Sequence, residues 1–132
     1  MTADRSKDPT KQLQAEAAER WPTEYSESRA RLKKLSASEQ KVLFDSGGAI
    51  TTSIAGLFIN GETADSPQVQ ELIGRHYRWV DCFWTPSQAS YIGLGELYVQ
   101  DQRFAQNYEK HATGLAEFMR RSMTLWACEN LT

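Results

Sequence analysis

Apolar residues recur every three or four positions along most of the chain, and no stretch alternates with the period of two that marks a strand. One helix is predicted over residues 36–60, because Ser36 and Glu39 match a capping box and Asn60-Gly61 is a stop signal. Its apolar positions keep helical spacing: Leu43, Ile50, Ile54, Leu57 and Phe58. Gly47-Gly48 should weaken or bend this helix, since each glycine costs about 1 kcal/mol relative to alanine.

Prolines and capping residues predict the other helix boundaries. Asp8-Pro9 begins a short helix that stops at Trp21-Pro22, and a second short helix is predicted from Thr23 to Leu35. Ser66-Pro67 begins a helix that is bounded by Pro86, and Thr85-Pro86-Ser87-Gln88 begins the next one. Asp101 begins a short helix around Phe104 and Tyr108, and Thr113-Gly114 precedes the last helix. The predicted fold class is therefore all-α, with six or seven helices.

The apolar faces of three predicted helices indicate where the core lies. The helix after Ser66 carries an apolar arc about 160° wide, which contains Val69, Leu72, Ile73, His76, Tyr77, Trp79, Val80, Phe83 and Trp84. The helix after Ser87 is apolar over well over half its circumference, which is typical of a buried helix. The last helix places on one face Leu115, Phe118, Met119, Ser122, Met123 and Trp126.

Length and composition predict a single domain. The chain has 132 residues, 40% of them hydrophobic and 24% charged, which excludes disordered and collagen-like classes. No apolar run approaches the roughly 18–20 residues of a membrane span. The N-terminus shows no signal peptide, so we expect a cytoplasmic location and reduced thiols at Cys82 and Cys128. A formal net charge of −2 suggests neither a nucleic acid nor a membrane as partner.

Large apolar side chains are unevenly distributed. Residues 1–35 hold only six of them, whereas residues 75–126 hold ten of the fourteen aromatic residues. We therefore expect residues 1–35 to form weakly anchored N-terminal lid helices and residues 36–132 to form the helical core of one domain, 1–132.

Motifs for catalysis are missing from the sequence: there is no phosphate-binding loop, HExxH, CxxC or nucleophile elbow. We predict a protein that is not an enzyme and that has no cofactor and no metal site. Gly93 and Gly95 are expected to let another helix approach closely. His76 is expected to be a hydrogen-bonded core histidine, and its alternative role is a haem ligand in a gas-binding domain.

The sequence has an excess of aromatic residues, and this excess is its most informative feature for function. Trp79, Phe83, Trp84 and Tyr91 bracket a proline-marked helix junction, and Tyr98 follows shortly after. About half of these aromatic residues are expected to be ordinary core, but tyrosine and tryptophan also suit flat heteroaromatic ligands. A hydrophobic binding cleft is the hypothesis that this composition favours.

Several segments resemble the TipA-type antibiotic-recognition domain, TipAS, the C-terminal sensor of some MerR-like multidrug-responsive transcriptional regulators. The segments are Glu19-Arg20-Trp21, Tyr25-Ser26-Glu27-Ser28, Gly61-Glu62, Ala64-Asp65-Ser66, Tyr91 to Val99, Asp101, Arg103-Phe104 and Gly114 to Arg120, and they cover about residues 10–128. The resemblance implies a globin-like all-α fold without haem, a cleft for bulky peptide-derived antibiotics such as thiopeptides, and N-terminal helices that close over the ligand.

Two departures from the family pattern change what the resemblance implies. The regulators carry a DNA-binding helix-turn-helix and a coiled coil ahead of this domain, whereas Met1 lies only a few residues before it here, so no direct DNA binding is expected. Thiopeptide-capturing members bond the antibiotic through a cysteine. That position falls on Pro86 in this sequence, and Cys82 lies one helical turn earlier. The resemblance therefore does not imply that this chain captures its ligand covalently.

The resulting hypothesis is a stand-alone domain that sequesters an aromatic or peptide-derived antibiotic without chemistry. The expected ligand-binding residues are Trp21, Tyr25, His76, Trp79, Phe83, Trp84, Tyr91, Leu94, Tyr98, Phe118 and Met119. The alternative from another class is a helical protein-interaction or homodimerisation module that uses the same groove.

Overall fold

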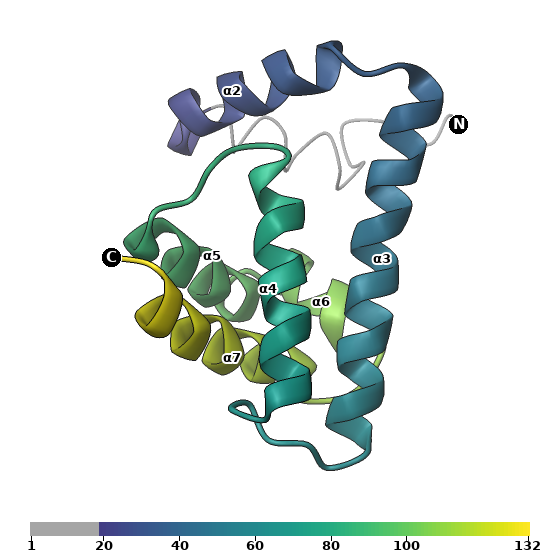
Figure 1. The fold of residues 1–132 in the computed structure, drawn as a ribbon, viewed down its shortest axis with the longest axis vertical. Helices are drawn as coiled ribbons and strands as arrows, with labels where there is room; N and C mark the ends of the chain where they lie inside the picture. The colour runs from purple at the N-terminus through teal and green to yellow at the C-terminus, as the bar shows by residue number, and fades with distance from the viewer. Residues whose placement is uncertain (1–18) are drawn as a thin grey trace, which may run out of the picture.

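The computed structural model describes residues 19–132 and is all-α over that range (Figure 1). Its helices are α2 (Pro22–Lys33), α3 (Ala37–Ile59), α4 (Pro67–Asp81), α5 (Gln88–Gln100), α6 (Gln102–Glu109) and α7 (Leu115–Asn130). This confirms the predicted fold class. The helix predicted to begin at Asp8 lies outside the described residues, apart from residues 19–20, which are helical.

Most helices begin at the capping residues that the sequence predicts. Ser36 forms the complete capping box with Glu39, and Ser66, Ser87 and Asp101 each accept a backbone hydrogen bond at the start of a helix. The last helix is capped differently, since Gly114 has a φ of 94° and no side chain. The Glu109 carboxylate instead accepts hydrogen bonds from the backbone N–H of Gly114 and of Ala116, both at 2.9 Å.

The core lies where α4, α5 and α7 meet, as Figure 1 shows. Gly95 allows the closest approach between α5 and α7, because a Cβ at this position would lie 3.3 Å from the Arg120 Cα. Around this contact Tyr91, Leu115, Met119 and Met123 are fully buried. The expected role of Gly95 in helix approach is therefore confirmed, whereas a Cβ at Gly93 would meet nothing within 4 Å.

The prediction that residues 88–100 form a buried helix is wrong. Only Tyr91, Gly95 and Tyr98 of α5 are buried, all on the face toward the core, and Val99 is 38% exposed. Apolar residues around a helix show what it could bury, but the packing of its neighbours decides which sides are covered. The remaining apolar side of α5 is half-buried and faces α2 across a cavity.

The first glycine of the Gly47-Gly48 pair in α3 has a packing role, whereas a Cβ at Gly48 would meet nothing within 4 Å. Residues 37–59 form one continuous helix. A Cβ at Gly47 would lie 2.4 Å from Cζ2 of Trp79, so the glycine lets the indole ring rest against the helix backbone. The indole N–H then donates a hydrogen bond to the Leu43 carbonyl at 2.8 Å. Gly47 therefore fixes the contact between α3 and α4.

Helix α3 is long and apolar enough to span a membrane by length and composition, with a mean hydropathy of 1.5 over its most apolar window. This corrects the expectation that no segment approaches a membrane span. Only 17% of that window is buried, and Val42 and Ile59 are each 66% exposed. Core helices of soluble domains pass the same test, and Ile54 and Ala55 of α3 do lie in the core.

Candidate functional site

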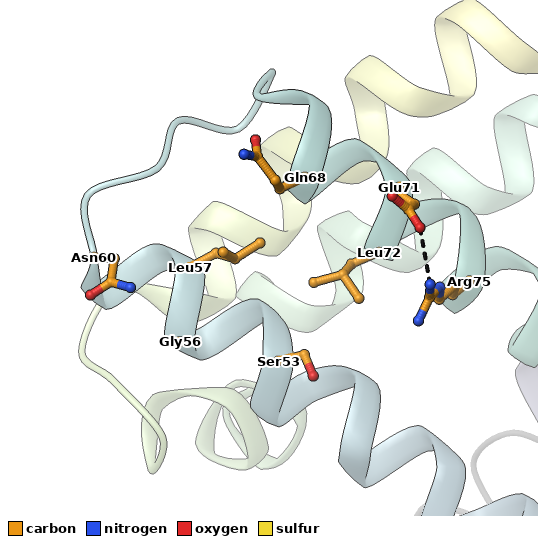
Figure 2. Close-up of a pocket in the computed structure, with 8 residues that line it drawn as sticks. All are labelled: Ser53, Gly56, Leu57, Asn60, Gln68, Glu71, Leu72 and Arg75. Carbon is orange, nitrogen blue, oxygen red and sulfur yellow. Dashed lines mark hydrogen bonds and ion pairs between the residues drawn. The ribbon is translucent and has the colours of Figure 1, made fainter.

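One groove of about 460 Å³ runs between α3 and α4 (Figure 2). Its eight lining residues are Ser53, Gly56, Leu57, Asn60, Gln68, Glu71, Leu72 and Arg75. Figure 2 shows Glu71 and Arg75 paired along α4, at 3.0 Å, on the α4 side of the groove. The groove has no aromatic wall and contains none of the predicted ligand-binding residues, so it does not match the expected cleft.

A second cavity of about 340 Å³ lies between α2 and α5, and it is strongly aromatic. Its lining residues are Trp21, Glu24, Tyr25, Ser28, Trp84, Ser90, Gly93, Leu94, Leu97 and Phe104. This volume is in the range of small-molecule sites. We take this cavity, called the α2–α5 pocket below, as the candidate site.

Two helices present matching faces to the α2–α5 pocket. The contribution of the α2 segment is Trp21, Glu24, Tyr25 and Ser28, and that of α5 is Ser90, Gly93, Leu94 and Leu97. Both sets have the spacing i, i+3, i+4, i+7, which is one face of a helix. Ser90 and Gly93 are small, so space remains between the helices. Trp84, from the α4–α5 connection, and Phe104, from α6, complete the walls.

Polar contacts at one end of α2 hold this helix over the pocket. No residue of α2 is buried. The Arg31 guanidinium donates hydrogen bonds to the Asp81 carbonyl, to the Glu27 carboxylate and, at 3.1 Å, to the Thr85 hydroxyl. Arg31, Asp81 and Thr85 therefore form a latch, called the Arg31 latch below, between α2 and the connection after α4.

Four of the eleven predicted ligand-binding residues line the α2–α5 pocket, namely Trp21, Tyr25, Trp84 and Leu94. Six lining residues are absent from the predicted set, namely Glu24, Ser28, Ser90, Gly93, Leu97 and Phe104. Leu97 lies three residues after Leu94 on the same helical face, so its spacing was a usable signal. Glu24 carried no such signal, because the prediction rested on an excess of aromatic and apolar residues.

Five other predicted residues lie in the core, with exposures of 0–6%. They are His76, Tyr91, Tyr98, Phe118 and Met119. The remaining two, Trp79 and Phe83, are half-buried and pack edge to face, with ring centroids 5.0 Å apart and an interplanar angle of 73°. Phe83 also contacts Phe44 of α3, at 5.9 Å. These seven residues therefore support the helices around the pocket rather than line it.

His76 is the centre of a buried hydrogen-bond network. Its Nδ1 lies 2.7 Å from the Tyr91 hydroxyl, and its Nε2 lies 3.4 Å from the Tyr98 hydroxyl. Burial lowers the pKa of His76 from 6.5 to about 4 and raises the pKa of Tyr98 to about 12. The histidine is thus neutral at pH 7. Both ring nitrogens have partners, as expected for a core histidine, and this arrangement disfavours the alternative of a haem ligand.

Neither cysteine lines the α2–α5 pocket. Cys82 and Cys128 are both free and exposed, and the Cys82 thiol lies 3.4 Å from the Arg78 carbonyl. Pro86 is buried, and its carbonyl accepts a hydrogen bond from the Tyr77 hydroxyl at 2.6 Å. Within residues 19–132, no three His, Cys, Asp or Glu side chains are grouped so that they could hold a metal ion.

Comparison with protein families gives a match to the TipAS antibiotic-recognition domain over residues 13–126. The HTH-type transcriptional regulator SkgA of Caulobacter vibrioides is 28% identical over 131 residues, which cover 91% of this chain and 50% of SkgA. The HTH-type transcriptional activator TipA of Streptomyces coelicolor is 28% identical over 116 residues, 83% of this chain and 44% of TipA. The chain therefore spans about half the length of these curated relatives.

A solved structure shares the fold. It is the complex of TipAS with nosiheptide, from a thiopeptide antibiotic multidrug resistance system of Streptomyces lividans. The TM-score is 0.79 at 25% sequence identity, and the match covers 90% of this chain and 85% of that one. The globin-like all-α architecture implied by the sequence resemblance is thereby confirmed.

Proposed function

Because the chain belongs to the TipAS antibiotic-recognition domain family, we propose that it binds an aromatic or peptide-derived antibiotic in the α2–α5 pocket and leaves the ligand chemically unchanged. The observation that carries the proposal is the convergence of four aromatic side chains on one cavity: Trp21, Tyr25, Trp84 and Phe104. Stacking and apolar burial against these rings would supply most of the affinity.

Helix α2 supports the proposal because its pocket residues come from a weakly held element. Trp21, Glu24, Tyr25 and Ser28 contribute four of the ten lining residues, yet no residue of α2 is buried. A helix held by the Arg31 latch can move away and admit a ligand larger than the cavity itself. The ligand would then supply apolar contacts that α2 lacks with the core. Part of the binding free energy would be spent on ordering α2.

In this proposal the pocket residues recognise the ligand and do not contact DNA. The formal net charge of −2 over the 132 residues offers no excess of cations for phosphate. The proposal also assigns no catalytic step, because the titratable network around His76 lies in the core and does not line the pocket. We propose a cytoplasmic location, in line with the transcriptional regulators among the relatives.

Two glycines give a matched pair of variants that tests the pocket. A Cβ at Gly93 or at Gly48 would meet nothing within 4 Å, and both glycines lie inside helices. Gly93→Leu places a side chain into the pocket, whereas Gly48→Leu places one on the exposed side of α3. Both should leave the melting temperature unchanged or raise it slightly, since leucine favours helix by up to about 1 kcal/mol over glycine.

The experiment screens a panel of peptide antibiotics that includes nosiheptide by thermal shift, followed by calorimetry of each hit. A ligand at about 100 times its Kd should stabilise the protein by about 2.7 kcal/mol. Gly93→Leu should weaken binding at least about tenfold, whereas Gly48→Leu should bind like the wild type. Mass spectrometry of the released ligand should return its original mass. Equal binding by both variants would place the site elsewhere, and an altered ligand mass would indicate catalysis.

A protein-interaction function is the second candidate, and exposed apolar side chains on α3 favour it. Val42 and Ile59 are each 66% exposed, and Phe44 is 51% exposed. These residues lie outside the α2–α5 pocket, so self-association through α3 could accompany ligand binding. Light scattering across a concentration series without ligand tests this function. A mass that rises with concentration, and that a Phe44→Glu variant returns to 15.0 kDa, would support it.

A further inference from the structure

Charge in the α2–α5 pocket comes from one side chain. Among the ten lining residues, Glu24 is the only one that carries a formal charge, and the other nine are aromatic, aliphatic, serine or glycine. A carboxylate in such surroundings loses part of its hydration without gaining a partner from the walls. Such a pocket is expected to discriminate between ligands by the sign of their charge.

The Glu24 carboxylate has no partner within residues 19–132. It makes no hydrogen bond or ion pair there. Glu27, about one helical turn further along α2, is in contrast paired with Arg31. Arg20 lies four residues before Glu24, at a spacing that could form an ion pair. Its guanidinium instead lies over the ring of Trp21, 4.6 Å from the ring centroid. No residue among 19–132 neutralises this half-buried carboxylate, so it can accept a cationic group from a ligand.

Aromatic rings around Glu24 add to its preference for a cation. Ring faces attract cations through their quadrupoles, and tryptophan does so most strongly. Trp21, Tyr25 and Trp84 line the same cavity as the carboxylate. A flat aromatic cation could therefore stack on Tyr25 or Trp84 and neutralise Glu24 at the same time, whereas the ring of Trp21 already has Arg20 over it. An anion would meet repulsion from Glu24, and none of the ten described lining residues is a cation that could receive it.

Glu24 also has a role within its own helix. It lies in the first turn of α2, where a negative charge interacts favourably with the helix dipole. That role would be fulfilled on any face of the helix and does not require a carboxylate on the side toward α5. A test must therefore separate an effect on ligand charge from an effect on helix α2.

We propose that the α2–α5 pocket selects ligands that carry a positively charged aromatic group, and that Glu24 is the residue that determines this specificity. The inference rests on the proposed function, in which this pocket binds aromatic compounds. It goes further by naming the charge class of the ligand.

The test uses three probes with the same ring system at pH 8: the 10-methylacridinium cation, uncharged acridine and the acridine-9-carboxylate anion. Calorimetry gives Kd for each probe with the wild type, with Glu24→Gln and with Glu19→Gln. The control removes an exposed charge near the same end of α2, at a residue that does not line the pocket. A general effect of net charge would appear in both variants.

In the wild type we expect the cation to bind about tenfold more tightly than uncharged acridine, and the anion to bind most weakly. Glu24→Gln should weaken cation binding about tenfold while changing the Kd of acridine less than about twofold. Glu19→Gln should preserve the preference. A Glu24→Gln effect that was equal for all three probes would mean that the residue acts only through helix α2, and would overturn the proposal.

The two proposals fail in different ways. If all three probes bind the wild type equally and Gly93→Leu abolishes their binding, the pocket remains the site but charge selection is overturned. If no probe binds, charge selection is overturned for aromatic ligands, and the peptide-antibiotic panel decides independently whether the pocket has a ligand. If the cation alone binds and Gly93→Leu abolishes its binding, both proposals hold.

Discussion

Helices α7 and α2 differ in how the fold holds them. Seven of the sixteen residues of α7 are buried, and Gly95 brings α5 against its backbone. None of the twelve residues of α2 is buried, and its contacts with the rest of the chain include the Arg31 latch and a hydrogen bond at 2.8 Å from Gln40 to the Leu32 carbonyl. Helix α7 is held by packing, whereas polar groups at the C-terminal end of α2 connect that helix to other described residues.

This difference shows how one small domain can be both stable and adaptable. Buried apolar area supplies most folding free energy, whereas exposed polar contacts contribute little. Helix α7 and its neighbours can therefore stay folded while α2 moves. The α2–α5 pocket lies at the boundary, with one wall on α5, which is packed on the core, and the other on α2. The predictions below test this contrast, beginning with the largest effect.

Truncating a core side chain should cost far more stability than truncating a residue of α2. Met123 is fully buried where α7 meets α5, so Met123→Ala should lower the free energy of unfolding by about 2–5 kcal/mol. Leu32 of α2 is half-buried, and Leu32→Ala should cost about 1 kcal/mol or less. Urea denaturation of both variants measures the difference. Similar costs would mean that α2 belongs to the core.

Acid should destabilise the core through His76. Because burial lowers the pKa of His76 from 6.5 to about 4, the unfolded chain binds more protons than the folded one between these values. The contribution of neutral His76 to the free energy of unfolding is therefore fully present above pH 6.5. It is lost as the pH falls to about 4, and the loss amounts to about 3 kcal/mol.

The control for this prediction is His76→Gln, which keeps a hydrogen-bonding side chain beside Tyr91 but does not titrate. Denaturation at several pH values should show a smaller loss of stability in the variant between pH 6.5 and 4. Parallel curves for the two proteins would show that His76 takes up its proton without cost, and that the network around it is more open than the structure indicates.

Helix boundaries were predictable because their signals are local. Ser36, Ser66, Ser87 and Asp101 each cap the helix that directly follows them, so a few neighbouring residues suffice. The cap of α7 was not predictable in this way. There a glutamate from the end of α6 reaches the backbone of Gly114, and this depends on how the chain turns between two helices.

The pocket was only partly predictable, because residue type does not distinguish a side chain that lines the pocket from one that is buried in the core. Tyr25 and Tyr91 are both tyrosines, yet Tyr25 lines the cavity and Tyr91 is fully buried between α4 and α7. The same holds for Trp84 and Trp79, since the indole of Trp79 is held against Gly47. Which face of α5 stays open depends on what α7 covers, and this follows from tertiary packing alone.

Breaking the Arg31 latch should loosen α2 with little effect on the core. Arg31→Gln removes the donors to the Asp81 carbonyl and to Thr85, contacts that are part-exposed and worth less than about 1 kcal/mol. Hydrogen exchange of amides in α2 should become about fivefold faster, while exchange in α7 stays unchanged. Arg29→Gln, at an exposed position of the same helix, is the control. Unchanged exchange in α2 would show that packing, and not the latch, holds the helix.

The smallest expected effect concerns Cys82, which lies where the core helix α4 meets the connection to α5. Its thiol is exposed and contacts the Arg78 carbonyl, outside the α2–α5 pocket, and Pro86 offers no nucleophile. A ligand held in the pocket should therefore stay unattached. Incubation with a thiopeptide that carries dehydroalanine should leave the intact mass of the protein unchanged. An adduct that maps to Cys82 and disappears in Cys82→Ser would contradict this prediction. Because Cys82 does not line the pocket in this arrangement of α2, such an adduct would also mean that the ligand binds with α2 displaced.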